Sequence, residues 1–455
     1  MNLRVTGAVT AAKAAGIASR VLGRGGGTAL PGLVAERLDP GIVGHLGRQL
    51  GRRVFVTGTN GKTTTSRMLA AILEAAGQPT LHNREGSNLM RGFASTLCAQ
   101  AGPMGGIAGA AGMVGLFETD EATMPAATAA LKPSVLVFTN LFRDQLDRYG
   151  EVDTVAALWR EALINAPANA TLVLNADDPS VASLAEGWTG GLHYFGIDDL
   201  AMAGTLAGAS DARWCTVCGG TFAYERRYFA HVGWWRCTGC DRKRAFPQTQ
   251  ASDVHLALDR ATFREAGMGE LQTPLTGLYN VYNAVAAIAA ARALGIDNAA
   301  IRTGLAAVRP AFGRQEVVSY AAKSIRLLLC KNPAGANEIL RLLAVLEPGL
   351  NLAVLLNDRF ADGQDVSWTW DVDFENIRDR VAAVFAGGSR AEDMALRLEY
   401  AGWPAALGIS SSPAVILDAI AQRPETEWFV IATYTAMLDF RGELQRRGAT
   451  KGSWE

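Results

Sequence analysis

The sequence has neither an excess of one charge nor a long uninterrupted apolar run, and these absences exclude classes of protein. Its 43 Lys and Arg residues balance 44 Asp and Glu residues, so no basic excess supports nucleic-acid binding. The apolar stretch from Gly105 to Phe117 is too short and glycine-rich to span a bilayer. Lys13 and Arg20 interrupt the N-terminal segment before a signal-peptide core can form. We expect a cytoplasmic protein without a transmembrane segment.

The most informative stretch is VFVTGTNGKTTT, from Val54 to Thr65. An apolar strand leads into a glycine-rich turn, followed by a lysine, three threonines and a predicted helix from Ser66 to Ala76. Such a turn lets backbone N–H groups and the positive end of a helix surround an anion. We expect phosphates to bind at Thr59, Asn60, Gly61, Lys62, Thr63 and Thr64.

Within this loop, Lys62 would reach the β and γ phosphates of a nucleotide and Thr63 would coordinate Mg²⁺. The strict GxxxxGK[ST] pattern fails, because Val56 stands at the position of its first glycine. The alternative interpretation is a glycine and threonine turn with a solvated lysine, which leaves three consecutive threonines unexplained.

Short apolar segments alternate with helical patterns in both halves of the chain. The predicted strands are Val54 to Val56, Gly112 to Phe117, Val135 to Thr139, Leu172 to Leu174, Leu352 to Leu356, Val384 to Ala386 and Trp428 to Ala432. This alternation predicts an α/β fold with parallel sheets and helices on both faces. At 455 residues, 49% of them apolar, the chain can fill two or three domain cores.

We predict three parts. Residues 1–45 would form a helix and a loop that pack on the middle domain. Residues 46–310 would form the ATP-binding middle domain, and residues 311–455 a Rossmann-like C-terminal α/β domain.

Four of the six cysteines form two CxxC pairs separated by eighteen residues: Cys215, Cys218, Cys237 and Cys240. This is the spacing of a zinc ribbon, in which four thiolates hold one structural Zn²⁺. We therefore predict a zinc-ribbon insertion at about residues 208–248. Two disulfides are the alternative, which a cytoplasmic location disfavours. The segment between the pairs is rich in aromatic residues and arginine, as in some single-strand nucleic-acid binders, but a ribbon with little core needs these aromatics for packing.

Several motifs occur in the same order as in the Mur ligases and folylpolyglutamate synthetases, which the chain resembles. They are TGTNGKTTT, Glu118 after GMVGLF, TNLFRDQLDRYG (Thr139 to Gly150), LNADDP (Leu174 to Pro179), GLYNVYNAVAA (Gly277 to Ala287) and Arg314 in FGRQEVV. Those enzymes use ATP to activate a carboxylate as an acyl phosphate. The resemblance implies that Lys62 and Glu118 are catalytic, Glu118 as a Mg²⁺ ligand, and that Asn280 and Arg314 contact the nucleotide.

Two features depart from the peptide-adding members of this group. Gln145 stands where they usually have a Mg²⁺-coordinating histidine. No lysine lies between Lys132 and Lys243, the region where they carry a carbamylated lysine. A second Mg²⁺ site is therefore in doubt.

The C-terminal part narrows the resemblance to the MurT family. It contains LLLCKNPAGANEIL (Leu327 to Leu340), NDRFADGQDVSWTWDVDFE (Asn357 to Glu375) and TYTAMLDFR (Thr433 to Arg441). The resemblance implies ATP-dependent amidation of the α-carboxylate of D-glutamate in lipid II to D-isoglutamine. Contact with the membrane would be peripheral, through this substrate or the partner.

The chain shows no nucleophilic cysteine in a glutaminase context, so ammonia must come from outside. In the MurT family a GatD-type class I glutamine amidotransferase supplies it, and an aspartate of the ligase subunit completes the Cys-His pair of GatD. We favour Asp362, with Asp358 and Asp365 as alternatives. The competing interpretation is that Asp362 and Gly363 only form a turn.

Two other functions stay open at this point. An amino-acid ligase of the Mur or folylpolyglutamate type would act without a glutaminase partner. A non-catalytic ATP-binding or zinc-ribbon nucleic-acid module is disfavoured by the net charge of -1.

Overall fold

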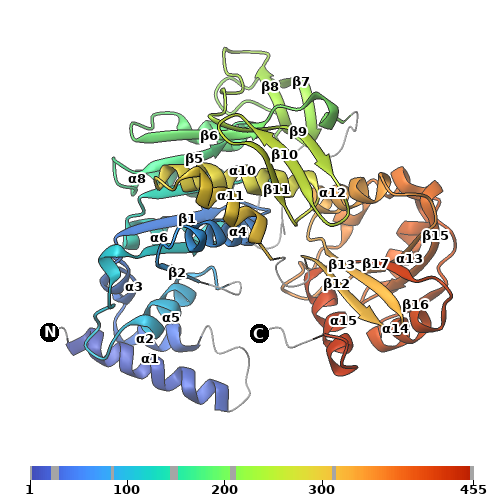
Figure 1. Ribbon diagram of the computed structural model, residues 1–455, viewed down its shortest axis with the longest axis horizontal. Coiled ribbons are helices and arrows are strands. Elements are labelled where there is room, and N and C mark those ends of the chain that lie inside the picture. The colour runs from blue at the N-terminus through green and yellow to red at the C-terminus, as the bar shows by residue number, and fades with distance from the viewer. Residues whose placement is uncertain are drawn as a thin grey trace.

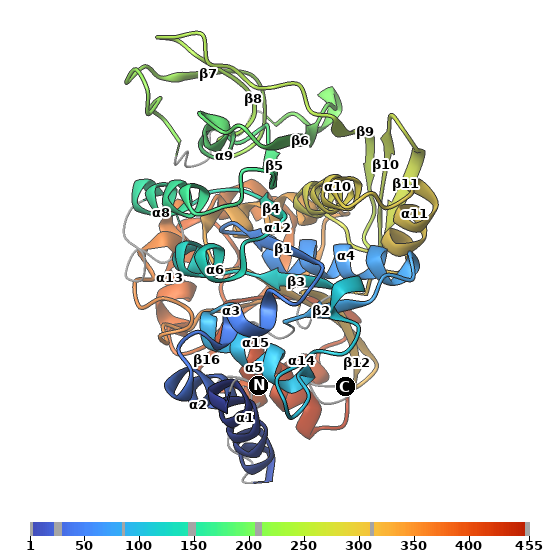
Figure 2. The same ribbon diagram turned by 90° about the vertical axis from the view of Figure 1, so that its left-hand side faces the viewer.

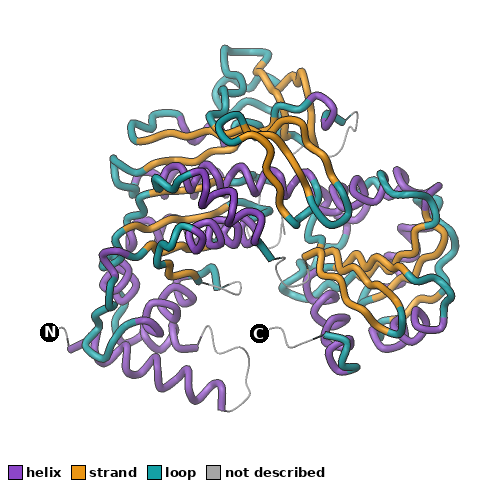
Figure 3. Tube along the Cα trace, in the orientation of Figure 1, coloured by secondary structure: helices purple, strands orange, loops and turns teal. Residues whose placement is uncertain are grey.

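The computed structural model describes residues 3–21, 30–83, 87–143, 152–204, 212–309 and 314–450. These residues form two α/β domains, each built on its own sheet, and a two-stranded hairpin (Figures 1 and 3). The larger sheet belongs to the middle part of the chain, and the smaller sheet to the C-terminal part.

The larger sheet has nine strands in the order β11-β10-β9-β6-β5-β4-β1-β3-β2. The strands from β2 to β9 in this order run parallel, and β10 and β11 add an antiparallel edge. Their bounds are β1 (Arg52–Thr57), β2 (Thr80–His82), β3 (Val114–Glu118), β4 (Val135–Phe138), β5 (Thr171–Asn175), β6 (Gly191–Ile197), β9 (Thr249–Leu256), β10 (Ala261–Glu265) and β11 (Gly269–Thr273).

Helices cover both faces of this sheet, which is why its central strands are apolar at successive positions. In β1, Val54 and Val56 pack into one core, and Phe55 packs into the core on the opposite face. The first core is closed by α4 (Lys62–Ala75), α10 (Leu278–Ala293) and α11 (Asn298–Ala307). The second is closed by α3 (Ile42–Gly47), α5 (Met90–Gln100), α6 (Met124–Leu131) and α8 (Val152–Ile164).

The N-terminal part differs from the predicted helix and loop. It contains α1 (Leu3–Val21) and a second helix, α2 (Leu30–Leu38), before α3. The second helix begins at Leu30. Val9 and Ala35 are buried in the second core, so these helices pack against the large sheet (Figure 2).

The third element is an antiparallel hairpin of β7 (Phe222–Phe229) and β8 (Val232–Cys237). It lies between β6 and β9 in the sequence, and these two strands are neighbours in the large sheet. The hairpin is therefore an insertion that leaves the sheet continuous, and it extends from the edge of the middle domain in Figure 2. The predicted start of the insertion, residue 208, lies outside the described residues. The short helix α9 (Pro179–Ala182) precedes β6.

The C-terminal domain has six strands in the order β12-β13-β17-β14-β15-β16, all parallel except β12. The strands are β12 (Arg314–Tyr320), β13 (Lys323–Leu329), β14 (Leu350–Leu355), β15 (Val381–Gly387), β16 (Gly408–Ser410) and β17 (Glu427–Ala432). The helices are α12 (Pro333–Ala344), α13 (Ala391–Tyr400), α14 (Pro413–Gln422) and α15 (Tyr434–Arg446). One face packs against α12 and α13, and the other against α14 and α15.

The α/β prediction is confirmed, and every predicted strand overlaps an observed one. Two details are wrong. The helix after the phosphate loop begins at Lys62 rather than Ser66, and each sheet has an antiparallel edge, so neither is purely parallel. The predicted boundary at residues 310 and 311 lies outside the described residues. No helix among the described residues is both long enough and apolar enough to cross a bilayer.

Candidate active site

The loop between β1 and α4 depends on glycine. Gly61 has a φ of 87°, and a Cβ atom built on it would lie 2.1 Å from Asn283 Oδ1. Any other residue would be strained and would clash with α10. No side chain caps the first turn of α4, because its N-cap residue is Gly61. The N–H groups at this positive end of the helix dipole therefore face the loop without a capping oxygen. This is the local structure that binds an anion.

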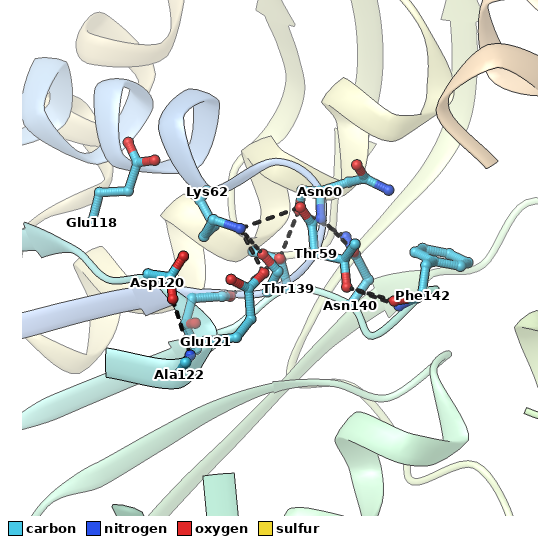
Figure 4. Close-up of polar contacts among 12 residues, drawn as sticks. Thr59, Asn60, Lys62, Glu118, Asp120, Glu121, Ala122, Thr139, Asn140 and Phe142 are labelled. Atoms are coloured by element: carbon cyan, nitrogen blue, oxygen red, sulfur yellow. Dashed lines mark hydrogen bonds and ion pairs between the residues drawn. The ribbon is translucent and has the colours of Figure 1, made fainter. Parts of the chain in front are cut away.

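Asn140, which follows β4, holds the other side of the loop (Figure 4). Its backbone oxygen accepts from Thr59 N at 3.0 Å, and its Oδ1 accepts from Asn60 N at 2.9 Å. Thr139 Oγ1 donates to Asn60 O at 2.8 Å. The N–H groups of Thr59 and Asn60 therefore bond to Asn140 and shape the loop. Of the six predicted phosphate contacts, those at residues 61–64 are better placed to bind an anion.

Lys62 lies in the first turn of α4 and points back over the loop. Its Nζ is 2.6 Å from Glu121 Oε1 and donates to Gly58 O at 2.5 Å. Both side chains of the ion pair are largely buried, at 13% and 7% exposure. Sequence reasoning missed Glu121, although it stands three residues after Glu118 in the same acidic segment, ETDE.

Thr63 and Glu118, the predicted Mg²⁺ ligands, lie together. Thr63 Oγ1 donates to Glu118 Oε1 at 3.0 Å, and Glu118 is buried at the end of β3. Hydroxyl and carboxylate oxygens are the ligands that Mg²⁺ prefers, so the pair fits that ion. Asn83 fixes the backbone of Glu118, because its side chain accepts from Glu118 N and donates to Glu118 O, both at 2.8 Å. No sequence pattern pointed to Asn83.

Asn280, the predicted adenine contact, is buried in the first turn of α10. Its Nδ2 donates to Thr276 O at 2.8 Å, and its Oδ1 accepts from Asn283 Nδ2 at 3.0 Å. Asn283 also accepts from Thr65 Oγ1 at 3.2 Å. Asn280 therefore supports α4 through Asn283, the second asparagine of GLYNVYN, which sequence reasoning did not single out.

The side chains of two residues with predicted roles lie outside the described part of the structure. Arg314 begins β12, at the start of the C-terminal domain, and its side chain is outside the described set. Gln145 lies outside the described residues altogether. Their roles stay predictions.

The four predicted zinc ligands converge at the open end of the hairpin. Their Sγ atoms all lie within 4.8 Å of one another. The Sγ atoms of Cys215 and Cys240 are 3.9 Å apart, and those of Cys218 and Cys237 are 3.4 Å apart. Four thiolates around one Zn²⁺ at about 2.3 Å would be about 3.8 Å apart, so the cluster fits the ion. All six cysteines are free thiols, which contradicts the disulfide alternative.

Backbone and guanidinium donors favour the thiolate form of two of these cysteines. Burial opposes ionisation of Cys215, but N–H groups of residues 217 and 218 and a hydrogen bond from Arg242 lower its pKa to about 6. The N–H of Gly239 lowers the pKa of Cys237. The pKa of Cys218 is raised despite the N–H of Gly220, because its thiol bonds to Cys237. A cation in the cluster would offset the repulsion between such thiolates.

The aromatic and arginine side chains of the hairpin pack on the middle domain. Trp235 Nε1 donates to Ala176 O at 2.9 Å, and Tyr228 is only 2% exposed. Arg244, just beyond the hairpin, pairs with the fully buried Asp177. These contacts support the packing interpretation over nucleic-acid binding.

The aspartates of the loop after β14 differ in exposure. Asp362, our first choice from the sequence, is buried, and its carboxylate accepts from the N–H and hydroxyl of Thr435 at the start of α15. Asp358 is 31% exposed, and its Oδ1 accepts from Ser389 Oγ at 2.8 Å. Asp365 is exposed and accepts from Ser367 N, which lowers its pKa. Asp358 also pairs with Arg390 at 3.5 Å. The geometry thus leaves Asp358 and Asp365, rather than the buried Asp362, as the carboxylates that another protein could reach.

The C-terminal domain reaches the phosphate loop through the start of α12. Asn332, which stands before Pro333 in the KNP segment, exchanges side-chain hydrogen bonds with Asn60. Arg341, two turns further along α12, donates to Tyr228 O in the hairpin at 2.6 Å. One helix of the C-terminal domain therefore contacts both the candidate nucleotide site and the hairpin.

The sequence matches two family models and several known proteins. The family model described as Mur ligase middle domain matches residues 56–217, and the model described as MurT ligase C-terminal matches residues 329–437. The lipid II isoglutaminyl synthase (glutamine-hydrolyzing) subunit MurT of Streptococcus pneumoniae is 36% identical over 452 residues. That match covers 98% of each chain.

Solved structures share the fold at lower identity. A pseudomurein peptide ligase type C from Methanothermus fervidus aligns with a TM-score of 0.65 at 23% identity, over 87% of this chain and 78% of that one. The folylpolyglutamate synthase of Mycobacterium tuberculosis, complexed with ADP and AMPPCP, aligns with a TM-score of 0.58 at 16% identity, over 98% of this chain and 96% of that one.

Proposed function

Because this chain belongs to the MurT family of Mur-type, ATP-dependent ligases, we propose that it amidates the α-carboxylate of D-glutamate in lipid II to give D-isoglutamine. The observation that carries the proposal is the arrangement of Lys62, Thr63 and Glu118 at the positive end of α4. It occurs in a chain that matches a lipid II isoglutaminyl synthase subunit over 98% of its length.

The chemistry follows from the weakness of a carboxylate as an electrophile. A carboxylate oxygen attacks the γ-phosphorus of ATP, which forms an acyl phosphate and releases ADP. Ammonia then attacks the carbonyl carbon, phosphate leaves with the bonding electrons, and the nitrogen loses one proton, which the departing phosphate can take up. Lys62 and the N-terminus of α4 stabilise the negative charge on the phosphates during this transfer. Glu121 holds Lys62 over the loop at 2.6 Å.

Thr63 and Glu118 would hold Mg²⁺, which neutralises phosphate charge when bound. The backbone of Glu118 is fixed for this role by two hydrogen bonds with Asn83, which donates to Glu118 O and accepts from Glu118 N. ATP as the nucleotide is supported by the complex of the similar folylpolyglutamate synthase with ADP. Asn280 and Arg314 remain our proposed nucleotide contacts. Asn280 lies in the first turn of α10, so the contact would be made at the start of that helix.

We place the source of ammonia in a second subunit, a GatD-type class I glutamine amidotransferase. The relative from Streptococcus pneumoniae is a subunit of a glutamine-hydrolyzing synthase, which supports this. An aspartate of the loop after β14 would orient the histidine of the glutaminase. The sequence favours Asp362, whereas the geometry favours a carboxylate outside the core, either the partly exposed Asp358 or the exposed Asp365.

The cysteine cluster would hold one structural Zn²⁺. Four protein ligands complete a tetrahedron and leave no position for a substrate. The ion would fix the open end of the hairpin, whose aromatic residues then pack on the middle domain.

The direct test supplies the purified chain with a lipid II analogue, ATP, Mg²⁺ and ammonium chloride. We expect a carboxamide in place of the carboxylate, identified by mass spectrometry, and one ADP per product. With glutamine as the nitrogen source, product should form only when the glutaminase subunit is added. Lys62→Ala serves as the inactive control.

The competing function, an amino-acid ligase that acts alone, predicts a different product. Each of the twenty amino acids and D-glutamate would be offered singly in place of ammonium. A product that gains an amino-acid residue, with no amidation by ammonium, would replace the proposed function with this one. ATP turnover that depends on neither nitrogen source would contradict both.

A further inference from the structure

The hairpin of β7 and β8 carries the cysteine cluster at its open end and a histidine at its closed end. The strands pair from Phe222 with Cys237 to Phe229 with Val232, and Ala230 and His231 form the turn. Ala230 has a φ of 44°. Turns between strands usually lie on the surface, yet His231 is fully buried. The tip of the hairpin is therefore inserted into the middle domain.

His231 meets two groups that belong to the ends of neighbouring strands of the large sheet. Its Nε2 is 3.4 Å from Asp178 Oδ2, and both side chains are fully buried. Its ring centroid lies 4.6 Å from that of Phe142. Asp178 follows β5, and Phe142 follows β4, so one side chain joins two loops at the carboxyl edge of the sheet.

These two loops are connected to the phosphate loop by direct hydrogen bonds. The Asp178 oxygen that faces His231 also accepts from Leu141 N at 2.8 Å. The next residue, Phe142, donates its N–H to Thr59 Oγ1 at 2.9 Å, and Thr59 Oγ1 donates to Phe142 O at 3.1 Å. Figure 4 shows Thr59 beside Phe142. His231 is thus linked to the phosphate loop through residues 141 and 142.

Fold stability does not explain a histidine at this position. Within the described residues, the Nδ1 atom of His231 is buried without a hydrogen-bond partner, which destabilises a fold. An apolar side chain would pack against Phe142 without that loss. What the imidazole adds is its contact with Asp178, the carboxylate that holds Leu141.

We propose that His231 is a positioning residue of the nucleotide site. His231 at the hairpin tip contacts Asp178 and Phe142. Asp178 in turn holds the backbone of Leu141, and Phe142 bonds to Thr59. Through these contacts the tip sets the position of Thr59 in the phosphate loop. The inserted hairpin therefore acts on nucleotide binding from a distance and touches no nucleotide itself. This inference rests on the proposed nucleotide site.

The test measures ADP binding by calorimetry in the presence of Mg²⁺, with zinc content and melting temperature determined for every variant. His231→Ala should raise the Kd for ADP about fivefold or more, as for residues that couple through packed contacts, with zinc content unchanged. His231→Gln, whose amide can reach Asp178, should return the Kd to within about twofold of the original protein. His255→Ala removes an exposed histidine of β9 and is the matched control.

Hydrogen exchange supplies a readout that does not need a nucleotide. In His231→Ala the amides of Thr59 and Asn60 should exchange faster, while those of the C-terminal sheet stay unchanged. A Kd within about twofold of the original and unchanged exchange at these amides would overturn the proposal. A melting temperature that falls while both readouts stay unchanged would make His231 a structural residue only.

If His231→Ala does not fold, Phe142→Leu is measured in the same way, because it removes the ring that His231 contacts and keeps the backbone of residue 142. A raised Kd then supports the proposal, and an unchanged Kd overturns it. Binding of ADP by the original protein tests the premise separately: its absence would count against the proposed function, whereas binding unaffected by these variants would count only against the role of His231.

Discussion

Asn60 in the phosphate loop and Asn332 at the start of α12 exchange two side-chain hydrogen bonds between the two domains. The Nδ2 to Oδ1 distances are 3.4 Å and 3.2 Å. Asn332 is buried, and its Oδ1 also accepts from Gly335 N at 2.9 Å, so it caps α12. One amide therefore fixes both the beginning of α12 and the contact of this helix with the candidate nucleotide site.

The first prediction separates these two roles of Asn332. Asn332→Asp keeps an oxygen that caps α12 but loses the donor to Asn60 and places a negative charge beside the phosphate loop. We expect kcat for amidation to fall about tenfold or more. The capping oxygen is kept, but a charge is added at a buried position, so stability should also fall, by about 1 to 3 kcal/mol. Asn332→Ala should lose the cap as well, at a cost of about 1 kcal/mol.

The matched control is Asn337→Ala, one turn further along α12. Asn337 bonds to Asp373 within the C-terminal domain and does not contact the phosphate loop. It should lower stability without a selective loss of kcat. If Asn332→Asp turns over at the original rate, the contact between the two asparagines has no part in catalysis. Steady-state kinetics and urea unfolding supply both measurements.

The second prediction concerns the ion pair of Lys62 and Glu121. Lys62→Ala should lower ATP-dependent amidation by about a hundredfold or more, because the charge that meets the phosphates is lost. It should also cost about 3 kcal/mol of stability, because Glu121 loses the lysine with which it is buried.

The double variant Lys62→Ala with Glu121→Ala distinguishes the two effects. It should recover much of the stability and none of the activity, since removal of both partners leaves no unpaired buried charge. Recovery of activity in the double variant would show that Lys62 acts only through Glu121. Circular dichroism melts and coupled ADP assays are sufficient.

The third prediction is one zinc ion per chain. Cys237→Ser should release it and lower the melting temperature, because a structural zinc site contributes directly to the free energy of folding. Cys98→Ala is the control, since Cys98 is buried elsewhere and burial raises its pKa to about 11. Elemental analysis measures the content. The zinc assignment would be contradicted if the original protein folds without metal and Cys237→Ser melts at the same temperature.

Local sequence patterns were sufficient for those parts of the site that lie close together in the chain. The strand, glycine turn and lysine of Val54 to Lys62 predict their own geometry, and the CxxC spacing predicts the cysteine cluster. The first depends on contacts a few residues apart, and the second on two short knuckles that one hairpin brings together. The helix start at Lys62 was missed, because Thr63, Thr64 and Thr65 disfavour a helix by propensity, whereas packing of Leu69 and Ile72 in the core stabilises it.

Contacts between distant segments could not be predicted. Asn83, Glu121 and Asn332 look like ordinary polar residues, and their roles depend on which strand ends the sheet brings together. The buried aspartates give another example. A DG pair such as Asp362 with Gly363 has the same sequence whether its carboxylate faces solvent or caps α15, and only the fold places Thr435 against it.

The fourth prediction uses Glu338, buried on α12. Burial raises its pKa to about 7, against a partial offset from Arg341. The folded pKa lies above the ordinary value of 4.5, so the folded state binds the proton more tightly. The contribution to stability is complete below pH 4.5 and is lost as the pH rises through 7. The loss amounts to about 3 kcal/mol.

Glu338→Gln removes this dependence because an amide cannot ionise. We expect the variant to be more stable than the original protein at pH 8, and the difference to shrink at pH 5. Glu347→Gln, at an exposed position beyond the same helix, should show no such change. Urea unfolding at the two pH values measures it. Parallel stability curves for original and variant would contradict the prediction.

The last prediction decides between the aspartates after β14, and it rests on the proposed glutaminase partner. Asp358→Asn should lower glutamine hydrolysis in the complex by about a hundredfold or more, because the histidine of the partner loses its orienting carboxylate. Amidation with ammonium chloride should persist, since the phosphate loop is untouched. Asp362→Ala should instead lower the melting temperature, because Thr435 and the start of α15 lose their acceptor.

The comparison is informative in either direction. If Asp362→Asn stops glutamine hydrolysis while the chain keeps its stability, then Asp362 is the orienting residue, and Thr435 must release it when the partner binds. If Asp358→Asn alone stops it, Asp362 is the structural residue that the geometry indicates. Asp365→Asn is the third arm, because this carboxylate is exposed and accepts from Ser367 N. Normal hydrolysis in all three variants would remove this loop from the glutaminase site.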